Sequence, residues 1–211
     1  MFMKKGFFIV IDGGDGSGTT TVSKEVVKRL GWNAVHTREP GGSPYAEKIR
    51  ELILSEHAKM SDAKTQFAMF WAARRDHVLN TIEPAIKKGK VVVSDRFDSS
   101  TYAYQIVAQG HDDLEELFWR KRELFLSGVE PDLYILLDVP AEVGMERTRS
   151  RGEELTHFDR KKLEFHDKVN EGLRIFIGER IVQGHIIDAT QDLDAVIDET
   201  MGVIEEFIAG D

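Results

Sequence analysis

The chain has 211 residues, a formal net charge of −9 and no cysteine. This length suits one α/β domain with a substantial core, the acidic balance argues against broad binding to nucleic acid or anionic membranes, and the lack of cysteine excludes disulfides, thiol chemistry and cysteine-ligated zinc. Because no apolar run approaches the length of a membrane span and the start lacks a secretory signal, we expect a soluble, cytoplasmic protein with no nucleic-acid or membrane partner.

The first predicted element is a buried strand that leads into a glycine-rich loop. An apolar run, Phe7 to Ile11, predicts the strand, and a helical pattern begins at Thr20. Between them stand four glycines, Gly13, Gly14, Gly16 and Gly18. Glycine allows positive φ and a close approach of the backbone to a ligand, and the free amides at a helix start attract anions. Strand, loop and helix together predict a phosphate-binding loop.

The loop departs from the P-loop pattern at one position. The pattern requires Gly, four residues, Gly, Lys and then Ser or Thr. Gly13, Gly18 and Thr20 fit, but Thr19 stands where the lysine belongs. The cradle of amides can form, yet the cation that normally reaches the β- and γ-phosphates is missing. A glycine-rich turn without a ligand is the alternative, and a dinucleotide fingerprint fits less well because its third glycine would fall at Thr19.

Helices and strands alternate along the rest of the chain. We expect helices at 22–30, 45–54, 61–88, 99–109, 112–126, 141–151, 162–183 and 193–208, with Pro84 breaking or restarting the third. Further strands are expected at 33–37, 90–94, 132–139 and 185–187. Five apolar strands alternating with helices predict an α/β fold, with a five-stranded parallel sheet and helices on both faces, in a single domain spanning 1–211.

Charged residues follow four of the predicted strands. They are Asp12, Arg38, Asp95 with Arg96, and Asp138. The carboxyl ends of parallel strands meet at one edge of the sheet, and the ligands of such sheets bind there. We therefore expect these side chains to gather around one site.

Four residues near this edge are candidates for phosphate chemistry. A guanidinium binds phosphate oxygens as a fork, so Arg38 and Arg96 suit an acceptor phosphate, although a lone loop arginine is most often a solvated charge. Asp95 follows an apolar strand, as does the aspartate that holds Mg²⁺ in P-loop enzymes, and Thr20 could offer its hydroxyl to the same ion. An ion pair between Asp95 and Arg96 is the alternative.

Two further groups are open to a functional and a structural interpretation. Phe70 and Arg74 share a helix face, so the ring could stack on a base while the arginine binds its edge, but an aromatic residue at this spacing is usually core. Arg147, Arg149 and Arg151 precede a Gly-Glu-Glu segment. The region at about 147–162 could be a lid that closes arginines over transferring phosphates, or a solvated face.

The remaining signal is a set of motifs spread along nearly the whole chain. In order, they are Thr37-Arg38-Glu39-Pro40-Gly41-Gly42, Phe70-Trp71-Ala72-Ala73-Arg74, Asp95-Arg96-Phe97, Ser100-Thr101-Tyr102-Ala103-Tyr104-Gln105, Leu137-Asp138-Val139, Arg149-Ser150-Arg151-Gly152-Glu153 and Ile187-Asp188-Ala189-Thr190. Together they resemble the thymidylate kinases, a P-loop family of nucleoside monophosphate kinases. The resemblance implies a P-loop NTPase-type three-layer sandwich and phosphoryl transfer from ATP to dTMP, giving ADP and dTDP for dTTP synthesis, with Mg²⁺.

The resemblance also implies roles for the matching residues. ATP would contact Gly13, Gly14, Gly16, Ser17, Gly18, Thr19, Thr20, Thr21 and Ala189; dTMP would contact Asp15, Arg38, Phe70, Arg74, Arg96, Ser100, Thr101 and Gln105; Mg²⁺ would bind Thr20 and Asp95; and the catalytic residues would be Asp15, Asp95, Arg96, Arg149 and Arg151. Phe70 would stack on thymine, Arg74 would bind its carbonyl edge, and Asp15 would meet the sugar 3′-hydroxyl. A cis bond before Pro40 and a homodimer are further traits of the family.

Two positions depart from the family. Thr19 replaces the P-loop lysine, and His157 takes the place where many members carry a lid arginine. A histidine that contacts phosphate would help only when protonated. Three interpretations stay open: a working thymidylate kinase in which another cation replaces the lysine, which the intact arginines favour; a kinase for another deoxynucleotide or with an unusual donor; and a nucleotide-binding protein that has lost transfer.

Overall fold

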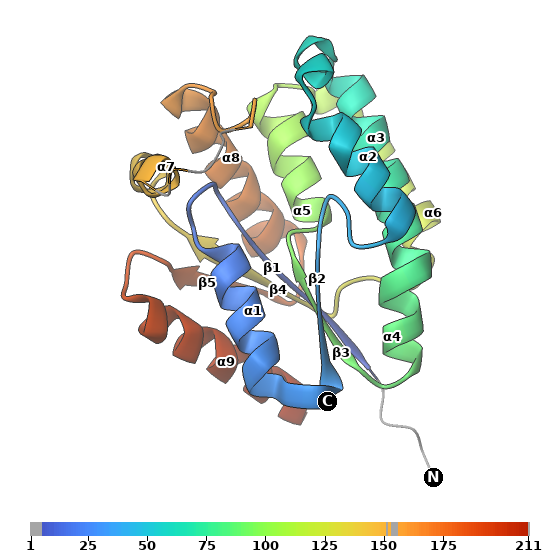
Figure 1. Ribbon diagram of the computed structural model, residues 1–211, viewed down its shortest axis with the longest axis vertical. Helices are drawn as coiled ribbons and strands as arrows, with labels where there is room; N and C mark the ends of the chain where they lie inside the picture. Colours follow the sequence, from blue (N-terminus) through green and yellow to red (C-terminus); the bar gives the residue numbers. More distant parts are fainter. Residues whose placement is uncertain (1–5, 151, 153–155, 211) are drawn as a thin grey trace.

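A five-stranded parallel sheet forms the centre of the molecule (Figure 1). The computed structural model describes residues 6–150, 152 and 156–210. The strands are β1 (Phe7–Gly13), β2 (Ala34–Arg38), β3 (Val91–Asp95), β4 (Leu133–Asp138) and β5 (Gly184–Asp188). They lie in the order β2-β3-β1-β4-β5, and each neighbouring pair is parallel. The predicted sheet is therefore confirmed, with each strand boundary within two residues of its prediction.

Helices cover both faces of the sheet, as the alternating pattern predicts. They are α1 (Thr19–Leu30), α2 (Pro44–Leu54), α3 (Ala63–His77), α4 (Glu83–Lys87), α5 (Asp98–Thr101), α6 (Glu115–Leu126), α7 (Ala141–Ser150), α8 (Leu163–Ile175) and α9 (Leu193–Gly210). Side chains of a strand alternate between faces, so Phe8 and Val10 pack with α3, α6 and α8, while Ile9 and Ile11 pack with α1 and α9 (Figure 1). None of the helices in the described ranges is long and apolar enough to cross a membrane.

Three predicted helices continue through π-helical segments. Val78–Ile82 joins α3 to α4, and Pro84 lies in the first turn of α4, directly after this π-helical segment. The region predicted at 61–88 is therefore helical from Ala63 to Lys87, and α-helical geometry restarts at Glu83, next to Pro84. Tyr102–Ala108 extends α5 in the same way. Phe176–Arg180 extends α8, which ends three residues before the predicted boundary because Ile181 takes an extended conformation.

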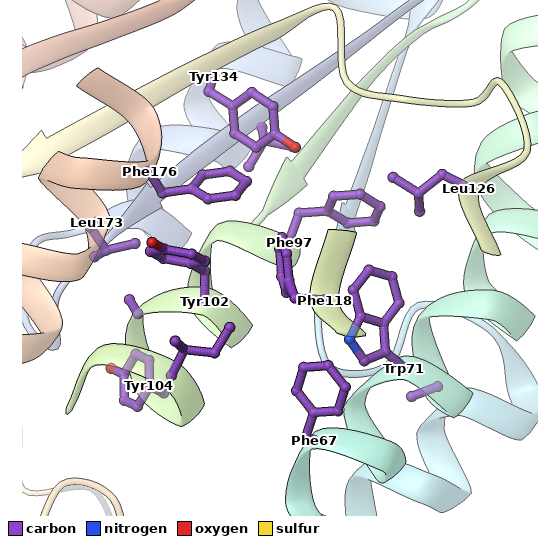
Figure 2. Packing of buried hydrophobic residues seen from close by; sticks show 14 of the residues in the cluster. Phe67, Trp71, Phe97, Tyr102, Tyr104, Phe118, Leu126, Tyr134, Leu173 and Phe176 are labelled. Carbon is purple, nitrogen blue, oxygen red and sulfur yellow. The ribbon is translucent and has the colours of Figure 1, made fainter. Parts of the chain in front are cut away.

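An aromatic layer fills the space between the sheet and the helices on one face (Figure 2). Phe118 of α6 makes edge contacts with Trp71 of α3 at a centroid distance of 5.4 Å and with Phe176 at 5.7 Å. Tyr102 contacts Phe118 at 5.5 Å. Aromatic pairs of this kind bury large areas and hold a defined geometry. This layer fixes α3 and the Tyr102–Ala108 segment relative to each other, and both elements contribute side chains to the site.

Candidate active site

A cavity of about 230 Å³ lies at the carboxyl ends of β1, β2 and β3. Its walls include ten predicted site residues, namely Asp15, Thr20, Arg38, Phe70, Arg74, Asp95, Arg96, Ser100, Thr101 and Gln105. The fold thus brings together every residue that the resemblance assigns to dTMP and both that it assigns to Mg²⁺. The glycines of the loop, together with Ser17, Thr19, Thr21, Arg149 and Ala189, lie outside these walls.

The glycine loop joins β1 to α1 and packs against two later helices. Gly16 has a φ of 75°, which favours glycine. A Cβ added at Gly16 would overlap the carbonyl oxygen of Gly144 in α7, and one added at Gly14 would overlap Oδ1 of Asn170 in α8. The loop therefore packs against α7 and α8 with no room for a side chain at Gly14 or Gly16. Thr19 begins α1 as a buried residue, so no charged side chain extends from that position.

Asp95 and Thr20 form a candidate magnesium site. The Thr20 hydroxyl donates to Asp95 Oδ2 at 2.5 Å, and Asp95 Oδ1 is buried without a hydrogen-bond partner among the described residues. Mg²⁺ is usually held by one or two protein oxygens, together with waters and substrate phosphates. An unpaired carboxylate oxygen beside a hydroxyl fits that requirement. The alternative of an ion pair with Arg96 is not what forms, because the Arg96 guanidinium contacts Asp12 and Asp15 instead.

Arg96 occupies a strained backbone position at the end of β3. Its φ is 69°, a region that non-glycine residues seldom adopt and that often marks functional sites. The guanidinium lies 3.3 Å from Asp12 Oδ1, 3.2 Å from Asp15 Oδ1 and 3.2 Å from the Ser100 hydroxyl. Burial alone would lower the pKa of Arg96, but Tyr104 and these carboxylates outweigh it and raise the pKa. The group stays charged and points its fork into the cavity.

Asp12 is a buried partner of the Arg96 guanidinium. The carboxylate is fully buried and accepts hydrogen bonds from the Ser99 hydroxyl at 2.5 Å, the Ser100 hydroxyl at 2.9 Å and the Gly13 amide at 2.8 Å. Burial raises the pKa of Asp12, although Arg96 and the three donors act against it. Sequence reasoning placed Asp12 at this edge of the sheet but assigned it no role. Its partners make it a support for Arg96 and Ser100.

Asp15 lies in the glycine loop and faces three other elements. Oδ1 accepts from the Tyr104 hydroxyl at 2.8 Å and contacts Arg96, while Oδ2 lies 3.3 Å from Nδ1 of His166. Burial acts to raise the pKa of Asp15, but His166, Arg96 and Tyr104 together lower it. The side chain is therefore an ionised acceptor at the wall of the cavity. Sequence reasoning singled out neither Tyr104 nor His166 as a site residue.

Arg74 is a buried arginine with one NH₂ group that has no partner among the described residues. It is 1% exposed, and its Nε donates to Glu39 Oε2 at 2.8 Å. Nη2 donates to the Phe97 carbonyl at 3.1 Å and to the Thr101 hydroxyl at 2.9 Å, whereas Nη1 has no partner among the described residues. Both amide atoms of Gln105, on the same cavity, are likewise buried and unpaired. Buried polar groups normally have hydrogen-bond partners, so we expect a polar ligand to bind these groups.

A chain of buried hydrogen bonds fixes Arg74 from behind. The second oxygen of Glu39 lies 3.0 Å from Nδ1 of His77, and Nε2 of His77 lies 2.6 Å from the Thr37 hydroxyl. All of these side chains are buried. The bond between Glu39 and Pro40 is cis, as the resemblance implies. The Thr-Arg-Glu-Pro-Gly-Gly motif therefore supplies the carboxylate that holds the arginine of the Ala-Ala-Arg motif.

Arg38 and Arg50 add positive charge to another wall of the cavity. Arg38 donates to Glu47 Oε2 at 2.9 Å and to the Pro40 carbonyl at 3.0 Å, and Arg50 donates to the same carbonyl at 2.8 Å. Burial and the neighbouring Arg38 lower the pKa of Arg50. Sequence reasoning missed Arg50. The available signal was its position three residues after Glu47, on the same face of α2.

Comparisons with known proteins decide the family. The family model described as Thymidylate kinase matches residues 11–200. A relative named thymidylate kinase from Staphylococcus haemolyticus is 37% identical over 205 residues, 95% of this chain and 98% of that protein. Another of the same name from Caulobacter vibrioides is 40% identical over 197 residues, 92% and 93% of the two chains. The chain belongs to the thymidylate kinase family.

A solved structure agrees with this assignment. The crystal structure of thymidylate kinase from Ehrlichia chaffeensis matches with a TM-score of 0.76 at 30% identity, covering 95% of this chain and 99% of that one. The fold is that of a P-loop NTPase, as predicted. As a member of the thymidylate kinase family, the chain is a nucleotide-binding transferase. The interpretations as a binding protein without transfer, or as a kinase for another acceptor, are not favoured.

The structure describes only part of the predicted lid segment of this thymidylate kinase family member. Arg151 and residues 153–155 lie outside the described residues, so the lid at about 147–162 stays a prediction. Arg149 lines a small second cavity with Asp15 and His166. Arg147 donates to the carbonyl of Ala189 at 2.9 Å, which joins the end of α7 to the loop after β5.

Three residues from the described part of the predicted lid line the main cavity, and the sequence assigned none of them to it; they are Thr156, Phe158 and Asp159. Phe158 lies 6.4 Å from the ring of Phe70 and 5.7 Å from that of Tyr104. His157 does not line the cavity. Burial, followed by Lys161 and Lys59, lowers the pKa of His157. The sequence pattern around 156–159 offered no sign of which side chain turns inward.

Proposed function

We propose that the protein transfers the γ-phosphoryl group of ATP to the 5′-phosphate of dTMP, giving dTDP and ADP for dTTP synthesis. The observation that carries this proposal is the pair of buried, unpaired groups on the cavity wall, Nη1 of Arg74 and the amide of Gln105. A flat base with two carbonyl oxygens and one ring N–H satisfies such groups, because it presents acceptors to the arginine and both kinds of partner to the amide. Thymine has this pattern.

The acceptor base and sugar have a complete set of neighbours. The ring of Phe70 lines the cavity and gives the base an aromatic face for stacking. The Thr101 hydroxyl accepts a hydrogen bond from Arg74 and so keeps that side chain in place. Asp15 offers a carboxylate oxygen to the 3′-hydroxyl of the sugar. In this assignment Arg74 donates hydrogen bonds to the carbonyl edge of the base, and Phe70 stacks on its face.

Three arginines are assigned to the acceptor phosphate. Arg38, Arg50 and Arg96 all line the cavity. One guanidinium group can donate to two phosphate oxygens at the same time. Arg96 is the one held by buried carboxylates, and Ser100 bonds to both Arg96 and Asp12. An arginine fixed in this way costs no reorganisation when the phosphate becomes the nucleophile of the reaction.

The donor is assigned to the glycine loop and its flanks. The amides from Gly13 to Thr21 would cradle the ATP phosphates, as in other phosphate-binding loops, and Ala189 would lie beside adenine. Thr20 and Asp95 would hold Mg²⁺. When bound, the ion neutralises charge on the phosphate oxygens. Arg149 and Arg151 are assigned to the transition state, where they would supply the charge that Thr19 lacks.

A homodimer is proposed as the assembly. An apolar groove between α3 and α6 is lined by Phe67, Trp71, Leu117 and Phe125, and Leu117 is 41% exposed. A second copy of the chain is the proposed occupant, as the resemblance to a dimeric family implies. Light scattering of the wild type and of Leu117→Glu tests this, since a monomeric wild type would contradict it.

The cytoplasm, where ATP and dTMP are found, is the proposed location.

The reaction is tested by ADP formation from ATP and Mg²⁺, with dTMP, dUMP, dGMP, dCMP or thymidine in separate reactions. We expect turnover with dTMP well above the others. Calorimetry with dTMP runs in parallel. Tight binding of dTMP without turnover on any acceptor would contradict transfer, and turnover on another acceptor above dTMP would contradict the assigned substrate.

A further inference from the structure

His166 is a buried histidine on α8 that the assignments above leave without a task. It is 3% exposed, and neither ring nitrogen has a hydrogen-bond partner among the described residues. Nδ1 lies 3.3 Å from Oδ2 of Asp15. A buried polar side chain without a full set of partners calls for an explanation, and here the nearest polar atom belongs to the proposed acceptor site.

The two oxygens of the Asp15 carboxylate have different surroundings. Oδ1 is engaged twice, by the Tyr104 hydroxyl at 2.8 Å and by Arg96 at 3.2 Å. Oδ2 has no hydrogen bond among the described residues, and His166 is the group within ion-pair distance of it. Oδ2 therefore faces His166, with which Asp15 lines a small second cavity. The ring of His166 approaches that oxygen and thereby restricts how the carboxylate can turn.

Helix α8 is built to hold the ring in this place. Asn170 lies four residues after His166, on the same helix face, and its Nδ2 donates to the Val139 carbonyl at 2.8 Å. Its Oδ1 occupies the space beside Gly14 of the glycine loop. The ring of Phe165 packs edge-on against His166 at 5.7 Å. The face of α8 that touches the loop is thus fixed at two successive turns.

Two other charged groups lie near His166. Arg149 of α7 and Asp159 of the segment before α8 line the same small cavity as His166 and Asp15. Oδ2 of Asp159 accepts from both the amide and the hydroxyl of Thr156, so that carboxylate is bonded within its own turn. Asp15 therefore remains the acidic partner of His166.

We propose that His166 is a positioning residue that holds the Asp15 carboxylate, through Oδ2, in the orientation in which it meets the 3′-hydroxyl of the acceptor nucleotide, and that it thereby favours acceptors carrying that hydroxyl. The inference rests on the proposed function, which assigns Asp15 to the sugar. The lowered pKa of Asp15 agrees with it, because His166 stabilises the ionised carboxylate against the effect of burial. His166 itself touches neither the base nor the phosphates in this assignment.

The test compares two acceptors that differ by one hydroxyl. Calorimetry measures the affinity of the full chain for dTMP and for 3′-deoxythymidine monophosphate, in the wild type, His166→Phe, His166→Asn and the control His185→Phe on β5. We expect His166→Phe, which keeps a ring beside Phe165, to weaken dTMP binding about tenfold and to leave the 3′-deoxy acceptor within about twofold of the wild type. His166→Asn keeps a donor near the position of Nδ1 and should retain most of the affinity for dTMP.

The possible outcomes separate the inference from the function on which it rests. Equal losses on both acceptors would show that His166 only stabilises the fold, and unchanged dTMP binding by His166→Phe would show that it has no role at Asp15; either result overturns the inference alone. A wild type that binds neither nucleotide overturns the proposed function and the inference with it. In an Asp15→Asn background, His166→Phe should cause no further loss for dTMP, because the partner that it positions has lost its charge.

Discussion

The two halves of the candidate site are built in opposite ways. On the acceptor side, Arg74 and Arg96 line the main cavity and are held by buried carboxylates and hydroxyls. On the donor side, the glycine loop has a threonine, Thr19, where the family pattern has a lysine. Of the two arginines proposed to replace it, Arg149 lies near the end of α7 and lines the small second cavity, and Arg151 lies outside the described residues.

This difference separates the two tasks of the enzyme. Selecting the acceptor requires polar groups that are desolvated and fixed before binding, because an unpaired buried group discriminates strongly against a wrong partner. Holding the donor phosphates requires amides, a metal ion and positive charge, which can come from several residues. The acceptor side should therefore tolerate few substitutions. On the donor side, the effect of a substitution should depend on whether other charges already act there.

Replacing Arg96 is expected to have the largest effect. In Arg96→Ala the acceptor phosphate loses its fixed guanidinium, and Asp12 and Asp15 lose their shared cation. We expect kcat/KM to fall about 1,000-fold or more, as for other arginines that contact a transferring phosphoryl group. Arg96→Lys should recover little, since one ammonium does not bridge both carboxylates. Coupled ADP formation measures the loss, and Arg174→Ala, which removes an exposed pair with Asp138, is the control.

A loss below tenfold in Arg96→Ala would contradict the role given to this arginine. It would move the acceptor phosphate to Arg38 and Arg50 and weaken the contrast between a preassembled acceptor side and an adaptable donor side.

Glu39→Gln is expected to have the next largest effect. It should weaken dTMP binding and also lower the stability of the protein. The carboxylate of Glu39 contacts the Arg74 guanidinium and the His77 ring, all at positions that are at most 5% exposed. Breaking a buried ion pair from one side costs about 3 kcal/mol, because the remaining charge is left uncompensated. We expect that decrease in the free energy of unfolding by urea, together with a rise of about tenfold in the KM for dTMP.

Glu47→Gln is the matched control for this substitution, because Glu47 pairs with Arg38 at a half-exposed position. Its effect on stability should stay below about 1 kcal/mol. If the two variants lost equal stability, the buried chain from Thr37 to Arg74 would not be the framework of the acceptor side.

The sequence allowed the acceptor side to be predicted more fully than the donor side. The apolar strands and the positions of Arg38, Asp95 and Arg96 follow from hydrophobic pattern and sheet topology, since parallel strands bring their carboxyl ends together. Arg50 was not assigned, because its spacing from Glu47 shows only a shared helix face, and a surface arginine looks the same in the sequence whether it faces solvent or a cavity. The π turns were missed for a related reason, because their hydrophobic spacing barely differs from that of an α-helix.

The partners of Asp15 illustrate a second limit. His166 lies 151 positions later in the chain, and the contact exists because α8 packs against the glycine loop. No local pattern encodes such a pairing. The resemblance to thymidylate kinases supplied residues in motifs, whereas Tyr104, His166 and Phe158 became site residues only through tertiary packing.

Thr19→Lys tests whether the donor side already has the charge it needs. If Arg149 and Arg151 act there, an added ammonium duplicates an existing interaction, and kcat should change by less than about threefold. If the charge is truly absent, the substitution should raise kcat about 100-fold, the typical effect of one preorganised contact to a developing charge. Single-turnover rates at saturating ATP and dTMP separate chemistry from product release, and Gln183→Lys, at an exposed position just before β5, is the control.

His157→Ala is expected to change activity least. Burial, Lys161 and Lys59 lower the pKa of His157, so the ring is neutral at and above about pH 7 and has no charge to offer a phosphate. The ratio of the wild-type rate to the variant rate should therefore stay near one from about pH 7 to 8.5 and rise only under acidic conditions. A constant loss across that alkaline range would mean that His157 acts without its proton, as a hydrogen-bond donor. A loss that is present at pH 7 and disappears only between pH 7 and 8.5 would mean that the ring still carries its charge in that range, and it would then take the place of the family's lid arginine.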